Sequence, residues 1–436
     1  MVESILKRMT EDRVEFAELW FVDILGQLKT FTIPVSEMEK AFSEGLGFDG
    51  SSVEGFARIY ESDLIAKPDP DTYQIIPFIE TKTARFFCSI YLPDGRPYDG
   101  DPRYILKRFL EKIGREGYTF NVGPELEYFY FANSREPIMT DNGGYFDFIP
   151  MDEGSRMRME TIKLCEGMGA KVEAGHHEVA PSQHEIDLRY DEALKMADRM
   201  MTLKVLIKQV AAKNGRYATF MPKPLHGING SGLHIHQSLF REGRNVFFDA
   251  ADPNFLSAMA KSYVAGILKH SPAITSICNQ WVNSYKRLVP GYEAPVYVSW
   301  GRMNRSELVR IPIYKPGKEK ASRVELRSAD PACNPYLAFT VILAAGFAGI
   351  QEKLSVRPAI EEDIYRMDEH ERKRKKIDML PGSLIEAVKE TEKSSLIRQA
   401  LGDHVFFKFI ENKKIEWDMY RTQVTSYEIK EYLPIL

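Results

Sequence analysis

The stretch Gly123-Pro124-Glu125-Leu126-Glu127-Tyr128-Phe129-Tyr130-Phe131 decides how the chain is organised. Its aromatic bulk, following a Gly-Pro pair, predicts a β-strand. Because successive side chains of a strand alternate between faces, Glu125 and Glu127 point the same way. Two carboxylates 4 Å apart repel by roughly 4 kcal/mol at an effective dielectric constant near 20. Either one of them is protonated or a cation lies between them, unless the strand face is exposed and both acids are solvated.

Three later segments carry groups that match this acidic face. Residues 173–185 read as strand, turn and strand with acids on both arms. Residues 229–236 lead into a strand that carries His234 and His236 on one face, and residues 323–327 alternate charged and apolar side chains. We therefore expect a curved sheet with an apolar back and a charged, ligand-filled front.

The candidate metal ligands are five glutamates and one histidine: Glu125, Glu127, Glu178, Glu185, Glu325 and His234. An oxygen-dominated set suits Mg²⁺ or Mn²⁺, whereas zinc prefers more nitrogen or sulfur. Five negative charges exceed what one dication needs, so the set has room for two. Such cations would hold polyphosphate oxygens and stabilise phosphoryl transfer.

Arginines gather in the stretch between residues 287 and 327: Arg287, Arg305, Arg310, Arg323 and Arg327. Any one of them alone would more often form a surface salt bridge, but beside a two-metal face they favour an anionic substrate and ATP. His236 is either a core histidine or a phosphate contact, and the face it shares with His234 favours the phosphate contact. The sequence has no GxxxxGK[ST] motif, which excludes a P-loop enzyme.

Composition narrows the class of protein. A chain of 436 residues, 44% hydrophobic and 28% charged, is typical of a globular protein with two domains, or one large and one small. A net charge of −4 does not favour a nucleic-acid partner, and we interpret the basic run at residues 371–376 as a solvated surface element.

The cysteines and the apolar segments indicate the cellular compartment in which the protein is found. The four cysteines form no CxxC pair, which indicates a reducing compartment with neither a disulfide framework nor a zinc site. The charged N-terminus lacks a signal peptide. The longest apolar run, residues 336–350, is too short to cross a membrane and predicts a buried helix instead. We expect a cytoplasmic protein without membrane contact.

The order of strand and helix patterns along the chain predicts two domains. A small strand-rich domain covers residues 1–102 and a larger one covers residues 103–436, with the boundary at the turn-rich residues 93–102. Residues 45–55 are too glycine-rich for regular structure and read as a loop that presents Asp49 and Ser52. We expect helices at residues 3–11, 103–116, 191–214, 254–269 and 334–350 and from 383, then a mixed tail. We expect a hairpin of two strands at residues 14–22 and 26–33, and further strands at residues 73–78 and 85–91.

Six segments in order carry a family resemblance: residues 48–52 (FDGSS), 123–127 (GPELE), 176–180 (HHEVA), 229–236 (NGSGLHIH), 283–293 (NSYKRLVPGYE) and 304–306 (NRS). Over essentially its whole length the chain resembles a type I glutamine synthetase. The resemblance implies an α+β protein, with an N-terminal β-grasp domain and a catalytic domain whose curved antiparallel sheet is flanked by helices. In this family ATP phosphorylates glutamate, and ammonia attacks the γ-glutamyl phosphate to give glutamine, ADP and phosphate.

The resemblance also implies a role for each matching residue. Glu127, Glu178 and Glu185 would hold one metal, and Glu125, His234 and Glu325 a second at the phosphates, within a total of two to three Mg²⁺ or Mn²⁺. Glutamate would be bound by Asn229, Gly230, Arg287, Glu293, Arg305 and Arg327. The nucleotide would be bound by Glu173, His236, Ser238, Arg305, Arg310, Lys320 and Arg323. Asp49, with Ser52 nearby, would bind and deprotonate ammonium, Glu293 would lie on a flap that shields the intermediate from water, and Asp49, Glu293 and Arg305 would be catalytic.

Regulation and assembly follow from the same resemblance. One branch of the family carries an adenylylated tyrosine, but residues 370–380 contain no tyrosine, so adenylyl control is not expected. Residues 55–62 resemble the branch inhibited by glutamine, in which Arg58 would communicate product binding. The family implies a homododecamer of two stacked hexameric rings, with sites shared between neighbours and room for nitrogen-regulatory protein partners.

Two alternatives stay open from the sequence. A γ-glutamyl ligase of the same fold could use an amine or polyamine in place of ammonia, although a carboxylate at Asp49 suits a small ammonium ion. A catalytically silent relative would have lost metal ligands or the flap acid, and this chain has kept all of them. The sequence does not decide between Mg²⁺ and Mn²⁺.

Overall fold

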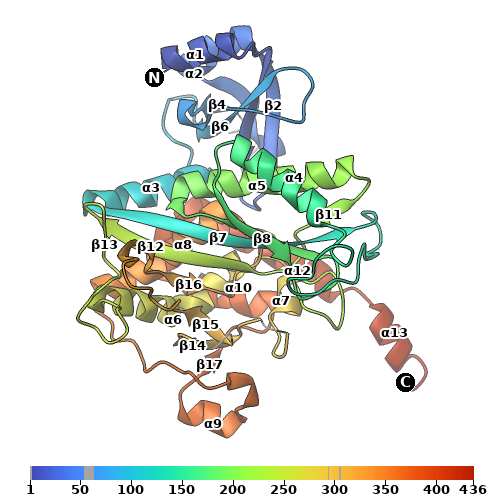
Figure 1. The fold of residues 1–436 in the computed structure, drawn as a ribbon, viewed down its shortest axis with the longest axis vertical. Helices are drawn as coiled ribbons and strands as arrows, with labels where there is room; N and C mark the ends of the chain where they lie inside the picture. Colours follow the sequence, from blue (N-terminus) through green and yellow to red (C-terminus); the bar gives the residue numbers. More distant parts are fainter. Residues whose placement is uncertain (1, 54–62, 293, 304–305) are drawn as a thin grey trace.

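The computed structural model of the chain describes residues 2–53, 63–292, 294–303 and 306–436. Figure 1 shows a small N-terminal part, in blue, above a larger body built on a long curved sheet. The sequence-predicted site residues Arg58, Glu293 and Arg305 lie outside the described residues.

The N-terminal part is a mixed sheet with the strand order β2-β1-β6-β4-β3, and β5 pairs with β6. Its strands are β1 (Phe16–Val22), β2 (Leu28–Pro34), β3 (Leu46–Asp49), β4 (Asp63–Pro68), β5 (Gln74–Ile75) and β6 (Thr83–Tyr91). Strands β1 and β2 form the predicted hairpin, whereas β1 and β6 run parallel. Helices α1 (Val2–Glu11) and α2 (Met38–Ser43) also belong to this part, and Leu19, Phe86 and Leu64 are among its fully buried core residues.

The prediction that residues 45–55 lack regular structure was wrong for their first half. Residues 46–49 form β3, which pairs antiparallel with β4. Gly45 has a φ of +79°, a left-handed conformation that glycine adopts without strain, and this lets the chain leave α2 and enter the strand. A 3-10 turn at Gly50–Ser52 follows, and the Asp49 side chain caps it by accepting from the Ser51 backbone.

The larger sheet has 11 strands among the described residues, in the order β17-β14-β15-β16-β12-β7-β9-β8 with β10, β11 and β13 at its margins. Strand β7 (Tyr118–Phe131) lies between β12 (Leu233–Arg241) and β9 (Gln183–Leu188), and β8 (Val172–His177) pairs with β9. The prediction that four distant segments share one sheet is confirmed by this order. The sheet is antiparallel except that β14 (Tyr297–Gly301) and β15 (Glu307–Arg310) run parallel.

The register of these strands places the acids opposite one another. Glu127 pairs with Glu185, and Glu125 with His234. On the other side of β12, His236 pairs with Glu325 of β16 (Val324–Leu326). Residues far apart in the sequence therefore meet on neighbouring strands.

Helix α8 (Pro335–Gln351) is the predicted buried helix, and it crosses α6 (Ala258–Cys278) at very close range. A Cβ on Gly349 would lie 2.1 Å from the Ser262 carbonyl oxygen, and one on Gly266 would lie 2.3 Å from that of Ala345. The predicted helix at residues 254–269 is shifted, because Ser257 supplies the N-terminal cap and the helix continues through Pro272 to Cys278.

A buried ionic network joins the two parts. Arg103, at the start of α3 (Pro102–Arg115), is bonded to Asp69 at 2.8 Å and to Asp198 of α5 (Ala193–Lys213) at 2.9 Å. Tyr336 of α8 donates to the other oxygen of Asp198 at 2.7 Å. Asn334 donates to the backbone carbonyl of Asp23 at 3.0 Å, so the β1–β2 turn also contacts the larger part.

The C-terminal region, expected to be mixed, is helical apart from a short strand that precedes its helices. The remaining elements are α4 (Ser155–Gly167), β10 (Asp191–Glu192), β11 (Tyr217–Thr219), β13 (Arg244–Asn245), α7 (Ser284–Arg287), α9 (Glu369–Arg374), β17 (Asp378–Met379), α10 (Leu384–Glu392), α11 (Ser395–Leu401), α12 (Asp403–Arg421) and α13 (Ser426–Tyr432). Helix α13 projects from the body in Figure 1, and Leu433 and Leu436, which follow it, are exposed. Within the described ranges, no helix combines the length and apolarity needed to cross a bilayer.

Candidate active site

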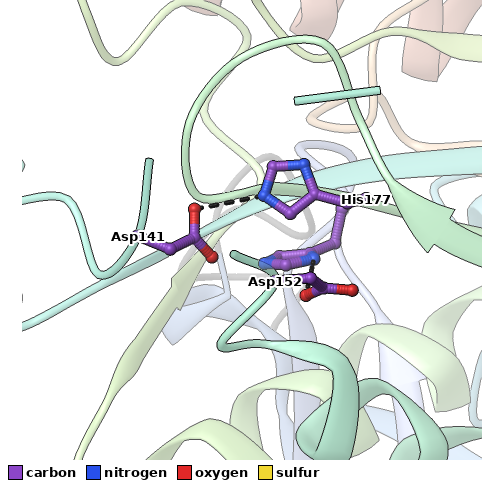
Figure 2. Close-up of side chains that lie close together, drawn as sticks. Asp141, Asp152 and His177 are labelled. Atoms are coloured by element: carbon purple, nitrogen blue, oxygen red, sulfur yellow. Dashed lines mark hydrogen bonds and ion pairs between the residues drawn. The ribbon is translucent and has the colours of Figure 1, made fainter. Parts of the chain in front are cut away.

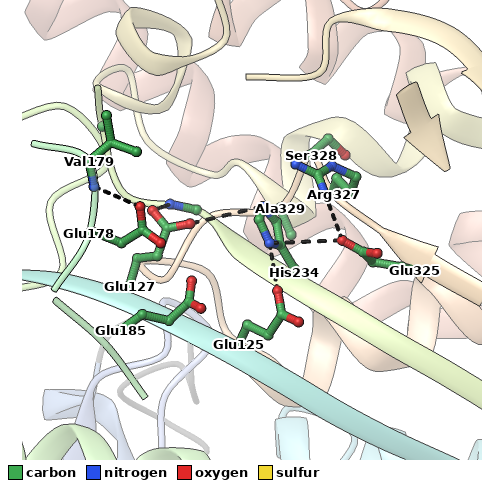
Figure 3. A network of polar contacts seen from close by, with 12 residues as sticks. Glu125, Glu127, Glu178, Val179, Glu185, His234, Glu325, Arg327, Ser328 and Ala329 are labelled. Atoms are coloured by element: carbon green, nitrogen blue, oxygen red, sulfur yellow. Dashed lines mark hydrogen bonds and ion pairs between the residues drawn. The ribbon is translucent and has the colours of Figure 1, made fainter. Parts of the chain in front are cut away.

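A cavity of about 390 Å³ opens on the front of the large sheet. In sequence order its lining residues run from Glu125 to Arg327, so no described residue of the N-terminal part lines it. Figure 3 shows the carboxylates of Glu125, Glu127, Glu178 and Glu185 around it, with His234 between them and Glu325. The sheet thus brings all six predicted metal ligands to one place.

Glu125, His234 and Glu325 form one compact group, whose ligand atoms all lie within 4.8 Å of one another. His234 Nδ1 lies 2.8 Å from Glu125 Oε2 and 3.9 Å from Glu325 Oε1. These are the three residues that the resemblance assigns to the phosphate-side metal. Two carboxylates and one imidazole fit a hard divalent cation.

The other predicted trio is distributed over two overlapping groups. Glu127 and Glu185 group with His234, whereas Glu178 and Glu185 group with His176. Glu185 belongs to both, and His176 Nε2 lies 3.1 Å from its Oε1. His176 lies within the motif at residues 176–180, but no role was predicted for it from the sequence.

The acids of β9 are strongly perturbed. Burial and the neighbouring charges of Glu127, Asp187, Glu125 and Glu178 raise the pKa of Glu185 well above its usual value. Burial and the Glu125 charge raise the pKa of Asp187 to about 7. Sequence reasoning missed Asp187, although it lies two residues beyond Glu185 and thus on the same strand face. This concentration of like charge supports a site that is neutralised by cations.

Glu325 behaves differently. Burial opposes its ionisation, but His236, Arg327 and His234 together hold the pKa of Glu325 below its ordinary value. Arg310 and Arg327 both donate to its carboxylate, at 3.0 and 2.9 Å. One buried carboxylate therefore orients two of the predicted substrate arginines.

The structure places the other predicted glutamate-binding residues in the same cavity: Asn229, Gly230, Arg287 and Arg327. Arg287 is buried and donates to the backbone carbonyls of Ser328 at 2.8 Å and Ala329 at 3.1 Å. Gly232 leaves room for it, since a Cβ there would lie 2.6 Å from the Arg287 guanidinium.

A second cavity, of about 550 Å³, adjoins the first and shares Glu125, Ala174 and Asp187 with it. It collects the following predicted nucleotide residues: Glu173, His236, Ser238, Lys320 and Arg323. Arg310, predicted for the same role, lines the first cavity instead. His236 bridges the two, because its Nε2 lies 2.6 Å from Glu125 and its Nδ1 accepts from Arg323 at 3.1 Å.

Asp49 is not brought to this site. Its side chain accepts from the backbone and the hydroxyl of Ser51, at 2.8 and 2.7 Å, and these bonds lower the pKa of Asp49. Asp49 is exposed at the end of β3 in the N-terminal part, and Ser52 lies in the 3-10 turn that follows.

Two family models match this architecture. The β-grasp domain of glutamine synthetase matches residues 13–93, and the glutamine synthetase catalytic domain matches residues 99–432. The chain belongs to the glutamine synthetase family. The family's reaction is the ATP-dependent, divalent-metal-dependent ligation of ammonia to L-glutamate, and the chain is an ATP-dependent ligase of that family.

Individual relatives agree with this assignment. The chain is 48% identical to the glutamine synthetase of Thermotoga maritima, covering 99% of each chain. It is 47% identical to that of Mycolicibacterium smegmatis, again over 99% of each, and 46% identical to that of Methanosarcina mazei, over 100% of this chain and 98% of the relative.

Solved structures agree as well. A GmaS–ADP complex superposes with a TM-score of 0.89 at 29% identity, covering 99% of each chain. The glutamine synthetase of Plasmodium falciparum superposes with a TM-score of 0.89 at 26% identity, over 99% of this chain and 98% of the other. The predicted fold class, an N-terminal β-grasp domain and a curved catalytic sheet flanked by helices, is confirmed.

Proposed function

We propose that this glutamine synthetase holds two or three divalent cations between the two cavities, one of them at Glu127, Glu178 and Glu185 and another at Glu125, His234 and Glu325. The observation that carries this proposal is that five of these six residues line the first cavity, that Glu125 also lines the second, and that the ligand atoms of Glu325, Glu125 and His234 lie within 4.8 Å of one another. The bound cations would neutralise the phosphate oxygens during transfer of the γ-phosphoryl group to glutamate.

The other side chains of the two cavities bind the two larger substrates. Asn229, Gly230, Arg287, Arg305 and Arg327 bind glutamate, and Glu173, His236, Ser238, Arg305, Arg310, Lys320 and Arg323 bind the nucleotide. Arg327 and Arg310 are held by one carboxylate, that of Glu325, so their guanidinium groups are oriented before substrate arrives. Transfer to the γ-carboxylate yields γ-glutamyl phosphate, which ammonia then attacks. Glu293 closes over this intermediate and excludes water.

The ammonium site is completed by a neighbouring copy of the chain. Asp49 and Ser52 lie in the N-terminal part, whereas every described residue lining the first cavity lies beyond residue 124. We call the first cavity and its lining residues the funnel. Head-to-tail contacts that place the next subunit's Asp49 loop at this funnel close into rings. We infer a homododecamer of two hexameric rings, in which the exposed apolar side chains of α13 and the residues after it supply contacts.

Regulation and location complete the proposal. Arg58 relays glutamine inhibition, and nitrogen-regulatory proteins are expected as partners. All four cysteines are free and buried, which fits the reducing cytoplasm.

The deciding experiment measures ADP release by the assembled enzyme with each substrate omitted in turn. We expect sustained ADP release and glutamine formation only when ATP, a divalent cation, glutamate and ammonium are all present. A series of primary amines and polyamines in place of ammonium tests the acceptor. A higher kcat/KM with any of these than with ammonium would contradict the ammonia assignment.

A further inference from the structure

Behind the β8–β9 hairpin lies a second group of potential ligands, formed by Asp141, Asp152, His177 and His184. All four residues are buried, and their ligand atoms lie within 4.8 Å of one another. Figure 2 shows the Asp141 carboxylate bonded to the His177 ring, and His184 Nδ1 lies 3.9 Å from Asp152 Oδ1. Two imidazoles and two carboxylates in a closed space have the composition of a zinc site.

The hydrogen bonds exclude that interpretation. Arg158 donates to Asp152 Oδ2 at 2.7 Å and to His184 Nδ1 at 2.9 Å, which uses the lone pair of the His184 ring. His177 donates through Nδ1 to the Glu178 carbonyl oxygen at 2.7 Å and through Nε2 to Asp141 Oδ1 at 3.1 Å. Neither ring keeps a lone pair for a metal, and the Arg158 guanidinium already supplies the cation.

The same bonds tie the group to the turn that carries a proposed metal ligand. Asp141 Oδ1 also accepts from the Ser182 backbone at 2.6 Å, and the Ser182 hydroxyl accepts from the Thr140 backbone at 2.7 Å. At the other end of the turn, the Glu178 backbone donates to the Gln183 carbonyl at 2.8 Å. The loop at residues 140–143 and both ends of the turn are therefore held by one set of buried bonds.

His177 lies at the centre of this arrangement, and the chain leaves space for its ring. A Cβ on Gly143 would lie 2.7 Å from His177 Nε2 and 3.0 Å from the Met151 carbonyl oxygen. The Nδ1 bond fixes the peptide that follows Glu178, and with it the direction in which the Glu178 side chain leaves the backbone.

We propose that His177 is a positioning residue, which aims the Glu178 carboxylate at the metal by holding the Glu178 carbonyl, while Asp141 fixes the ring. This inference rests on the proposed role of Glu178 as a metal ligand. Groups that orient metal ligands in this way typically contribute about 10- to 100-fold to metal affinity.

Two substitutions separate the bonds of the ring. In His177→Asn the amide nitrogen takes the place of Nδ1 and can still donate to the Glu178 carbonyl. In His177→Gln the amide nitrogen takes the place of Nε2 and can reach only Asp141. Gln fills more of the ring's space than Asn, so a purely space-filling role would make His177→Asn the more damaging change, the reverse of the order that the Nδ1 bond predicts.

The probe is Mn²⁺ alone, titrated into the assembled enzyme without nucleotide or glutamate and followed by the electron paramagnetic resonance signal of free Mn²⁺. We expect Glu178→Ala to abolish Mn²⁺ binding at its sites. At those same sites, His177→Gln should lower the Mn²⁺ affinity by about 10-fold or more, and His177→Asn should keep it within about three-fold of the wild type. Should the unpaired Asp141 prevent His177→Asn from folding, adding Asp141→Asn removes that charge and keeps the acceptor for Ser182.

Three outcomes would overturn the inference. Wild-type Mn²⁺ affinity in His177→Gln, or equal losses in both His177 variants, would show that the Nδ1 bond does not position the ligand. Unchanged Mn²⁺ binding in Glu178→Ala would instead remove Glu178 from the metal site and the inference with it. The Glu178→Ala arm thus distinguishes failure of the proposed ligand set from failure of the positioning role.

Discussion

At the scale of single residues, Glu325 connects the proposed metal ligands with the arginines of the site. It is almost fully buried, belongs to the phosphate-side ligand group and accepts hydrogen bonds from Arg310 and Arg327. A buried carboxylate shared between a metal and two guanidinium groups affects both the phosphate and the substrate side.

We predict that Glu325→Gln lowers kcat by at least about 10²-fold, because the amide keeps the volume but removes the charge on which phosphoryl transfer depends. Steady-state ADP release at saturating Mg²⁺ measures this. Glu352→Gln, a change at an exposed surface acid, is the control and should leave kcat unchanged. A near wild-type rate in Glu325→Gln would refute its place at the metal.

The raised pKa values of Glu185 and Asp187 predict a pH dependence. Their ordinary pKa values lie near 4, so above about pH 4 the folded, metal-free protein holds more protons than the unfolded chain, in the case of Asp187 up to about pH 7. The stability that these two groups contribute is therefore complete below pH 4 and declines as the pH rises through their raised pKa values. Metal requires the deprotonated groups, so affinity should increase over the same range.

Calorimetric titration of Mg²⁺ at pH 6, in buffers of different ionisation enthalpy, measures this linkage. We expect net proton release on binding, and less of it at pH 8. Glu185→Gln should reduce the release, whereas Glu386→Gln, far from both cavities along the chain, should not. Identical heats in all buffers at pH 6 would show that neither acid holds a proton there.

Some residues of the site could be predicted from the sequence, and others could not. The strand period alone placed Glu125 and Glu127 on one face, and the structure keeps them there. The same period of two relates Asp187 to Glu185, so Asp187 could have been found in this way. His176 could not, because its importance comes from its cross-strand neighbour Glu185, which no local spacing reveals. Asp49 was identified by its motif, but its distance from the cavity follows from the tertiary structure alone.

At the scale of elements, the sheet was predictable and the helix ends were not. Alternating charge marked β7, β9, β12 and β16, since one buried face imposes a period of two. The predicted start of α6 at residue 254 was wrong because Asp252 and Ser257 bond to local backbone groups and delay the helix. No periodicity could indicate how closely α6 approaches α8.

That crossing gives a prediction about stability. Gly349→Ala places a methyl group 2.1 Å from the Ser262 carbonyl oxygen, so the helices must separate at a cost of roughly 1–3 kcal/mol. Gly114→Ala in α3 meets nothing within 4 Å and should stabilise the helix by about 0.5–1 kcal/mol. Apparent melting temperatures should therefore move in opposite directions. A Gly349→Ala variant as stable as the wild type would mean that the two helices can separate without loss.

At the scale of the whole molecule, the position of Asp49 predicts complementation between subunits. Asp49→Ala and Arg327→Ala should each be almost inactive, because one lacks the loop acid and the other the funnel arginine. In mixed one-to-one rings a site is intact only where the Arg327 variant donates the loop and the Asp49 variant donates the funnel. Random mixing makes that about one site in four, so about a quarter of wild-type activity should return.

The measurement compares activity before and after the two variants are dissociated and reassembled together. Reassembly of Asp49→Ala alone and of Arg327→Ala alone provides the controls. Mixed rings as inactive as the separate variants would show that Asp49 acts within its own chain.

The buried contacts of Arg103 have a consequence for domain transplantation. The two family models divide near residues 93–99, yet Asp69 lies on one side of that division and Arg103, Asp198 and Tyr336 on the other. A hybrid with a relative's N-terminal domain should be more stable if that domain supplies an acid opposite Arg103, because Asp69 is one of the two carboxylates that pair with this buried guanidinium. The segment that can be exchanged without loss of stability therefore includes residues on both sides of the boundary between the family models. Calorimetry of paired hybrids with and without that acid would measure the difference in stability.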